Sequence, residues 1–280
     1  MSERSLFRRL LAPTFAISTL AGMAVAAYAR FVHPYRLRVT QLLLPLPRRH
    51  AHLDGLRIAF VSDTHIGPVF RATDLQPVIN ALRREKPDIL LLGGDYISES
   101  PRYIDEVIPA IADMAATARF GTYAVLGNHD ISNIRTRVSK PLRELGIPVL
   151  ENESIRVETD RGDLWIAGVD DSLMGVPDIA AAFRDVPSDA PSIVLWHVPD
   201  DAERAAEYGP LLQLSGHTHG GQVRLPLLGP LALPKLGRTF PSGKYVLGDM
   251  VLYVGNGIGM YRPPVRLNCP PELVFVRFLA

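Results

Sequence analysis

Strands and helices alternate in the pattern of apolar and polar positions along the first half of the chain. Continuous apolar runs bounded by turn residues predict buried strands at residues 57–62, 87–92, 122–126 and 147–150. The intervening segments predict helices at residues 73–85, 101–118 and 141–145, the first with apolar residues at helical spacing. Thr73 is the expected cap of the first helix. This alternation is typical of an α/β fold.

The pattern changes after residue 150. Residues 154–158 and 164–169 alternate apolar and polar positions on either side of a turn, which predicts a hairpin. A helix near residues 178–183 is followed by predicted strands at residues 192–196 and 211–214. Residues 251–256 are interpreted as the final core strand and a loop that returns to the site.

The amino-terminal segment has a pattern of its own. Residues 10–29 form a run of 20 residues without a charge, preceded by Arg4, Arg8 and Arg9. That length suits a helix that spans a bilayer. A cleaved signal peptide is the alternative, because residues 27–29 match an A-x-A cleavage pattern. Arginines on both sides of the run leave its orientation open.

These patterns divide the chain into three parts. We expect a membrane anchor or signal segment at residues 1–34, a linker with one strand at residues 35–56, and one domain at residues 57–280. The expected location is a bacterial-type inner membrane with a single-pass anchor on an undetermined side, and an exported form is the alternative. The formal net charge of +1 gives no reason to expect nucleic acid as a partner.

Candidate ligands follow the predicted strands. Metal-binding side chains cluster where ligands bind in α/β sheets, just beyond the strand ends, and they are Asp63, His65, Asp95, Asn128, His197, His217 and His219. These oxygen and nitrogen donors, without sulfur, suit manganese, zinc or iron. Seven ligands exceed one open site, and they suit two divalent metal ions that share Asp95. His129 is then left to donate a proton to the leaving group, with Asp130 placed to orient it.

Together these motifs resemble those of the calcineurin-like metallophosphoesterase family. The resemblance rests on Asp63-x-His65, Gly94-Asp95, Gly127-Asn128-His129-Asp130, His197 and Gly216-His217-x-His219, in that order. It implies a four-layer α/β/β/α sandwich, here preceded by one transmembrane helix. It also implies one metal held by Asp63, His65, Asp95 and His219, and a second held by Asp95, Asn128, His197 and His217.

Other polar residues are interpreted as structural. Asp88, Asp170 and Asp171 are expected in turns, and the linker histidines His33, His50 and His52 are expected to be solvated. Arg262 and Arg266 are expected at the surface, with a phosphate contact as the alternative. Cys269 is the single cysteine, which excludes an internal disulfide and a thiolate metal cluster.

An apolar segment rich in leucine and proline follows the last histidine motif, at residues 223–237. Because it adjoins the metal-binding turn, we expect it at the rim of the site, either packed under another loop or exposed to a lipid. The layout resembles the membrane-associated phosphodiesterase branch of the family.

The expected function is hydrolysis of a phosphodiester or pyrophosphate by metal-activated hydroxide, with a lipid-linked substrate as one option. UDP-2,3-diacylglucosamine hydrolysis in lipid A synthesis is an alternative, and a non-catalytic metal-bound scaffold is another.

Overall fold

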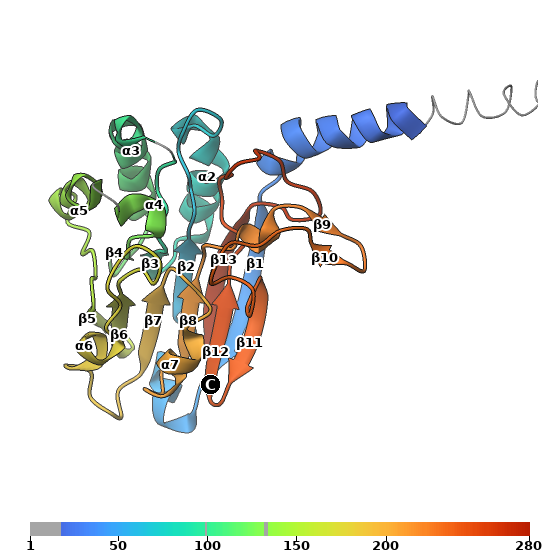
Figure 1. Cartoon of the computed structure of the whole chain (residues 1–280). Helices are drawn as coiled ribbons and strands as arrows, with labels where there is room; N and C mark the ends of the chain where they lie inside the picture. The colour runs from blue at the N-terminus through green and yellow to red at the C-terminus, as the bar shows by residue number, and fades with distance from the viewer. Residues whose placement is uncertain (1–17, 99, 132–133) are drawn as a thin grey trace, which may run out of the picture.

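Two β-sheets form the centre of the molecule, as the computed structural model shows for residues 18–98, 100–131 and 134–280 (Figure 1). The first sheet has the strand order β1(Arg38–Pro45), β13(Glu272–Leu279), β2(Arg57–Val61), β3(Ile89–Leu92) and β4(Thr122–Ala124). The second has the order β11(Gly243–Leu247), β12(Met250–Val254), β8(Leu212–Ser215), β7(Ser192–Trp196), β6(Gly162–Val169) and β5(Glu153–Thr159). A two-stranded hairpin, β9(Arg224–Leu225) and β10(Gly229–Pro230), lies apart from both sheets.

The sheets face each other across a shared apolar core. Phe60, Leu91 and Val125 from the first sheet pack in one buried cluster with Ile166 and Leu195 from the second. Such strands are buried on both faces, which is why the sequence shows them as continuous apolar runs rather than as alternating patterns.

Helices cover the two outer faces. The first sheet carries α2(Gln76–Glu85), α3(Ile104–Ala115) and α5(Arg135–Glu144), whose apolar sides share a buried cluster with the outer side chains of its strands. The second sheet carries α6(Ile179–Phe183) and α7(Ala202–Ala206) in the same way. The expected α/β class is therefore observed, and the clusters define four layers in the order α/β/β/α.

Short 3-10 turns complete the connections. They are η1(His33–Tyr35), η2(Arg48–Leu53), η3(Ala72–Leu75), η4(Pro101–Tyr103) and η6(His219–Gly221), and α4(Asn128–Ile131) is a single helical turn.

Several predicted elements differ from the observed ones, and the helix predicted at residues 141–145 begins earlier, as α5. Thr73 lies inside η3, and it is the Asp74 carboxylate that accepts the backbone N–H of Arg71 at the start of this turn. Residues 147–150 make only an isolated bridge, between Val149 and Ala124, rather than a strand. The final core strand is β13 rather than β12, and β13 lies inside the first sheet between β1 and β2.

The amino-terminal segment is described from residue 18 onward. Residues 18–31 form a helix that projects from the body of the molecule (Figure 1). The first eight residues of the predicted membrane-spanning run, 10–17, lie outside the described residues. Within the described ranges, no helix is both long enough and apolar enough to cross a membrane.

The segment expected to be a linker contributes to the first sheet. β1 pairs in parallel with β13 over its whole length, from Arg38 beside Glu272 to Pro45 beside Leu279. Leu42 and Leu44 of β1 are buried in the core between the sheets. A domain boundary at residue 57 stays a prediction, although the fold packs residues 38–45 with the residues that follow it.

Candidate metal centre

Strands from both sheets end at one place. β2 ends just before Asp63 and His65, β3 before Asp95, and β4 before Asn128 and His129. From the other sheet, β7 leads directly to His197, and β8 leads to His217 and His219. Because these strands are parallel within each sheet, their carboxyl ends meet at the same edge, and so do the predicted ligands.

The backbone turns sharply at the ligands themselves. Asp63, His65, Asp95, His217 and His219 have φ values of 53°, 44°, 55°, 67° and 49°. Non-glycine residues in this left-handed region are uncommon, and each costs about 1–3 kcal/mol. The left-handed turns bring His217 and His219 to one site, although extended backbone would send them to opposite faces.

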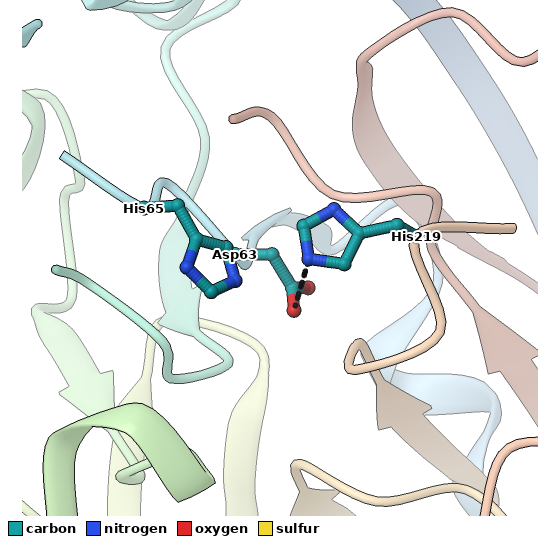
Figure 2. Close-up of side chains that lie close together, drawn as sticks. All are labelled: Asp63, His65 and His219. Carbon is teal, nitrogen blue, oxygen red and sulfur yellow. Dashed lines mark ion pairs between the residues drawn. The ribbon is translucent and has the colours of Figure 1, made fainter. Parts of the chain in front are cut away.

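The side chains converge on two carboxylates. His65 Nε2 lies 3.4 Å and His197 Nε2 lies 3.3 Å from Asp95 Oδ2. His219 Nε2 lies 3.5 Å from Asp63 Oδ1, and Figure 2 shows these two side chains with His65 beside them. Three groups of residues could each hold a cation, because the donor atoms within each group lie within 4.8 Å of one another. The groups are Asp63–His65–His219, His65–Asp95–His129 and Asp63–Asp95–His197.

Several of these buried atoms have no hydrogen-bond partner within the described chain. They are Asp63 Oδ2, both ring nitrogens of His65, and His197 Nε2. Nearly all buried polar atoms in native proteins have a partner, so each such atom requires an explanation. Cations bound among these atoms would give each of them a partner, except one ring nitrogen of His65. The donor set and its burial therefore fit a metal centre.

Other hydrogen bonds orient the histidines for binding. His197 Nδ1 donates to the Gly93 carbonyl at 2.7 Å, which turns Nε2 toward Asp95. His217 Nε2 donates to the Lys235 carbonyl at 2.9 Å, so its Nδ1 is unprotonated and lies 3.0 Å from Asn128 Oδ1. Two acceptor atoms at this distance do not bond to each other, but they can share a cation. Such outer hydrogen bonds typically fix the tautomer of metal-binding histidines.

Charge and burial set the protonation of the ligands. Burial raises the pKa of Asp95, but His197 and His65 outweigh it and hold that pKa well below its usual value. Burial, together with nearby His65 and Arg266, lowers the pKa of His219 well below its usual value. Asp95 is therefore anionic and His219 neutral at pH 7, and both are in the forms that bind metal.

His129 lies at the open side of the ligand cluster. Its backbone N–H donates to Asp95 Oδ1 at 2.8 Å, and its ring packs beside the rings of His65 and Tyr261, with centroids 4.9 and 5.0 Å away. Burial lowers the pKa of its imidazole.

Asp130 is buried beside the turn at Asp95, and its expected role of orienting His129 stays a prediction. Its carboxylate accepts the backbone N–H groups of Asp95, Tyr96 and Gly127 at 2.6, 3.0 and 3.0 Å. Both carboxylate oxygens are therefore bonded to backbone amides rather than directed at the His129 ring. Asp130 holds the left-handed turn at Asp95, and through it the position of the Asp95 carboxylate.

Glycines precede two of the ligand motifs because carboxylates pack against them. A Cβ at Gly127 would lie 2.2 Å from Asp95 Oδ1, and one at Gly216 would lie 2.2 Å from Asp63 Oδ2. Any side chain at either position would displace a ligand.

The three aspartates expected in turns lie in connections between elements. Asp88 accepts the backbone N–H of Arg57 at 2.8 Å, and Asp171 accepts those of Leu173 and Met174. Asp170 accepts two hydrogen bonds from the Arg135 guanidinium, each 3.0 Å long.

Two expectations about solvent exposure were wrong. His50 is buried, because η2 folds against the end of the first sheet, and it accepts a hydrogen bond from the Arg49 side chain. Arg266 is fully buried, and it donates to the carbonyls of Asn256, Gly257, Gly259 and Cys269. Arg266 therefore fixes the loop whose Gly259 N–H donates to the Asp63 carbonyl. The only sequence signal for this role was the glycine-rich stretch that precedes it.

A cavity of about 410 Å³ opens onto the ligands. One wall carries His65, Asp95, Asn128, His129, His217 and His219. The lining also includes Ala232, Leu233 and Pro234 of the apolar segment, together with Tyr261 and Arg262. Polar groups that bind metal therefore face an entrance that is partly apolar.

Comparison with known proteins identifies the fold family. Residues 56–221, more than half of the chain, match the calcineurin-like phosphoesterase family. The chain is 33% identical over 277 residues to the uncharacterized metallophosphoesterase YkuE of Bacillus subtilis, and the match covers 98% of this chain and 96% of that protein. It is 28% identical over 279 residues to the phosphodiesterase YaeI of Escherichia coli, with coverage of 97% and 98%.

A more distant relative has a named lipid substrate. The chain is 27% identical over 330 residues to the UDP-2,3-diacylglucosamine pyrophosphatase LpxG of Chlamydia trachomatis, with coverage of 95% and 97%. The family match, the two bacterial relatives and the buried donor set agree with one another. The chain belongs to the calcineurin-like phosphoesterase family and is a metal-dependent phosphoester hydrolase.

Proposed function

We propose that this enzyme hydrolyses a phosphodiester or a pyrophosphate at a centre of two divalent metal ions. One ion is held by Asp63, His65, Asp95 and His219, and the other by Asp95, Asn128, His197 and His217. The observation that carries the proposal is the convergence of buried donor atoms without partners around the Asp95 carboxylate. Oxygen and nitrogen donors without sulfur favour manganese, zinc or iron.

When bound, the two cations supply the charge that activates water, orients a phosphate and stabilises the attacking and leaving oxygens. The residues of the chain do the rest. His129 stands at the cavity wall beside the ligands and donates a proton to the leaving oxygen. The lowered pKa of its imidazole makes the protonated form a stronger acid. Asp130 acts through the backbone, as a positioning residue for Asp95.

The test is hydrolysis of bis-p-nitrophenyl phosphate by the purified, detergent-solubilised full chain, with and without added Mn²⁺. We expect turnover that depends on metal and that falls about 10²–10⁴-fold in His129→Ala, the usual contribution of a proton-transfer residue. Metal content per chain should be unchanged in this variant. Turnover that persists in His129→Ala would remove this residue from the mechanism.

One second candidate has a specific observation in its favour. The relationship to a UDP-2,3-diacylglucosamine pyrophosphatase supports the same substrate here, and the apolar rim of the cavity suits an acyl chain. Release of UMP from this lipid, lost in His129→Ala, would establish it. Turnover of the chromogenic diester alone would keep the general phosphodiesterase and reject the lipid A substrate.

A further inference from the structure

The hairpin of β9 and β10 presents an apolar tip to the solvent. Leu227 and Leu228 lie in its turn and are 107% and 78% exposed, and Leu231 just after β10 is 61% exposed. Soluble proteins rarely leave large apolar side chains together on the surface without a partner. We propose that this hairpin docks the enzyme on an anionic lipid bilayer, with its leucines inserted among the lipids.

A second apolar surface lies next to the hairpin. The loop over residues 261–268 joins them, because its Leu267 carbonyl accepts the Arg224 N–H of β9 and its Arg266 N–H donates to the Ala29 carbonyl. Ala29 belongs to the helix over residues 18–31, whose Phe31 is 67% exposed. Figure 1 shows this helix and the hairpin projecting from the same side of the molecule. The loop therefore joins the hairpin to the helix on one side of the molecule.

Charge on this side of the molecule complements an anionic membrane. The sequence has no Asp or Glu between residues 18 and 53, and only Asp249 between residues 208 and 271. Asp249 precedes β12, so it lies at the end of that strand remote from the metal centre. The same segments carry basic side chains, and the exposed ones include Arg36, Arg38, Lys235, Arg238 and Arg262.

One carboxylate does reach the apolar segment, but backbone amides already bind it. Asp200 accepts the N–H groups of Arg238, Thr239 and Phe240. Asp200 keeps its charge, but the exposed basic residues of these segments outnumber it, and each is worth about fivefold in affinity near an anionic surface. Basic residues around an apolar tip favour lipid over an apolar protein groove.

Docking in this way would direct the metal centre toward the membrane. Ala232, Leu233 and Pro234 follow the hairpin in the chain and line the same cavity as the ligands. A bilayer that contacts Leu228 would then lie at the entrance of the cavity. This part of the inference rests on the proposed function, and it assigns the substrate as a phosphate ester or pyrophosphate carried by a lipid.

Tryptophan quenching tests the docking without any catalysis. The full chain with Leu228→Trp is reconstituted in vesicles of phosphatidylcholine and phosphatidylglycerol whose acyl chains are brominated. Val246→Trp is the matched control, because Val246 is 65% exposed on β11 of the second sheet. The wild-type protein gives the background fluorescence and quenching of its two native tryptophans, Trp165 and Trp196.

We expect quenching of the residue 228 signal only, and weaker quenching without anionic lipid or at 1 M salt, where the screening length is about 3 Å. Equal quenching at both positions would overturn the proposal. So would no quenching at position 228 while the protein stays on the vesicles, which would point to a protein partner for the hairpin.

Comparing turnover of a soluble and a vesicle-borne substrate tests whether the substrate reaches the metal centre from the membrane. Leu227→Asp with Leu228→Asp should keep turnover of the soluble diester and lose at least about tenfold on a vesicle-borne phosphodiester, since burying each leucine contributes that much or more. Val246→Asp should affect neither. Equal effects on both substrates would reject delivery from the membrane. Absence of metal-dependent turnover in wild type would instead reject the proposed function and leave the quenching result intact.

Discussion

Two buried polar clusters, around Glu272 and around Asp95, differ in whether their polar atoms have hydrogen-bond partners. Around Glu272, every carboxylate oxygen has a partner: Oε1 accepts from Thr40 and from Tyr253, and Oε2 accepts the Asn256 N–H. Around Asp95, by contrast, buried donor atoms of Asp63, His65 and His197 have none within the described chain. Both clusters lie inside the fold.

The contrast shows how buried charge can be used. The Glu272 cluster is complete without any ligand, so it serves the structure by joining β1, β12 and β13. The Asp95 cluster leaves polar atoms unbonded, which costs free energy in the isolated chain and is recovered when cations bind. A complete network marks a structural site, and an incomplete one marks a binding site.

The largest effect should follow from removing the shared ligand. Asp95→Asn should lose metal and reduce kcat/KM for bis-p-nitrophenyl phosphate by more than about 100-fold, because even outer partners of a metal ligand cost about 10–100-fold. Metal content per chain and turnover measure the effect, with exposed Asp189→Asn as the control. Full metal content in Asp95→Asn would mean that the Asp95 cluster does not bind cations as proposed.

Removing the metal should lower the free energy of unfolding of the wild-type protein. At a metal concentration of 100 times Kd, binding to the folded state alone contributes about 2.7 kcal/mol to stability. Urea unfolding in Mn²⁺ and in excess EDTA measures this difference. It should vanish in Asp95→Asn and persist in Glu272→Gln. A difference of the same size in both variants would erase the distinction between the two clusters.

Breaking the complete cluster should lower stability without affecting the metal. Glu272→Gln replaces an accepting oxygen by an N–H donor, and we expect a loss of about 1–3 kcal/mol in the free energy of unfolding. Exposed Glu153→Gln is the matched control. A loss of metal in Glu272→Gln, rather than of stability, would show that this network also serves the metal centre.

The smallest effect should depend on pH. Burial raises the pKa of Asp170, but hydrogen bonds from Arg135 and from the Val176 and Asp171 amides outweigh it and lower that pKa below 3.8. The ionised form therefore stabilises the fold above about pH 4, and this contribution is lost as the pH falls through the folded pKa. Asp170→Asn should cost about 1 kcal/mol at pH 7 and progressively less below pH 4.

Urea unfolding of Asp170→Asn and wild type between pH 3 and pH 7 measures this dependence. A difference between the two proteins that does not change over that range would assign the effect of Asp170 to its packing rather than to its charge.

The convergence of the candidate ligands could be predicted from the sequence, whereas the long-range contacts around them could not. Asp63, Asp95 and His197 each follow a continuous apolar run, so strand end and ligand are marked by neighbouring residues. Such a signal is local. The Arg135–Asp170 contact joins residues 35 apart, and no local pattern marks it.

The misplaced elements have physical reasons of the same kind. Thr73 fits a cap by residue type, but the chain enters the helix through η3, whose N-cap is Arg71, and Thr73 lies inside that turn. No strand was predicted at β13, and its place in the sheet depends on pairing with β1, more than 200 residues earlier. Arg266 was assigned to the surface because charge usually lies there, whereas four carbonyls of the surrounding loops solvate it.

The pairing of β1 with β13 also bears on how the chain is made. Ribosomes add about 5–20 residues per second, so roughly 10–50 seconds separate the synthesis of Pro45 from that of its neighbours in β13. During that interval the leucines of β1 have no strand beside them, and β2 lacks its neighbour on the same side. A nascent chain with this strand order is therefore exposed to aggregation for most of its translation, and slower translation would lengthen that exposure.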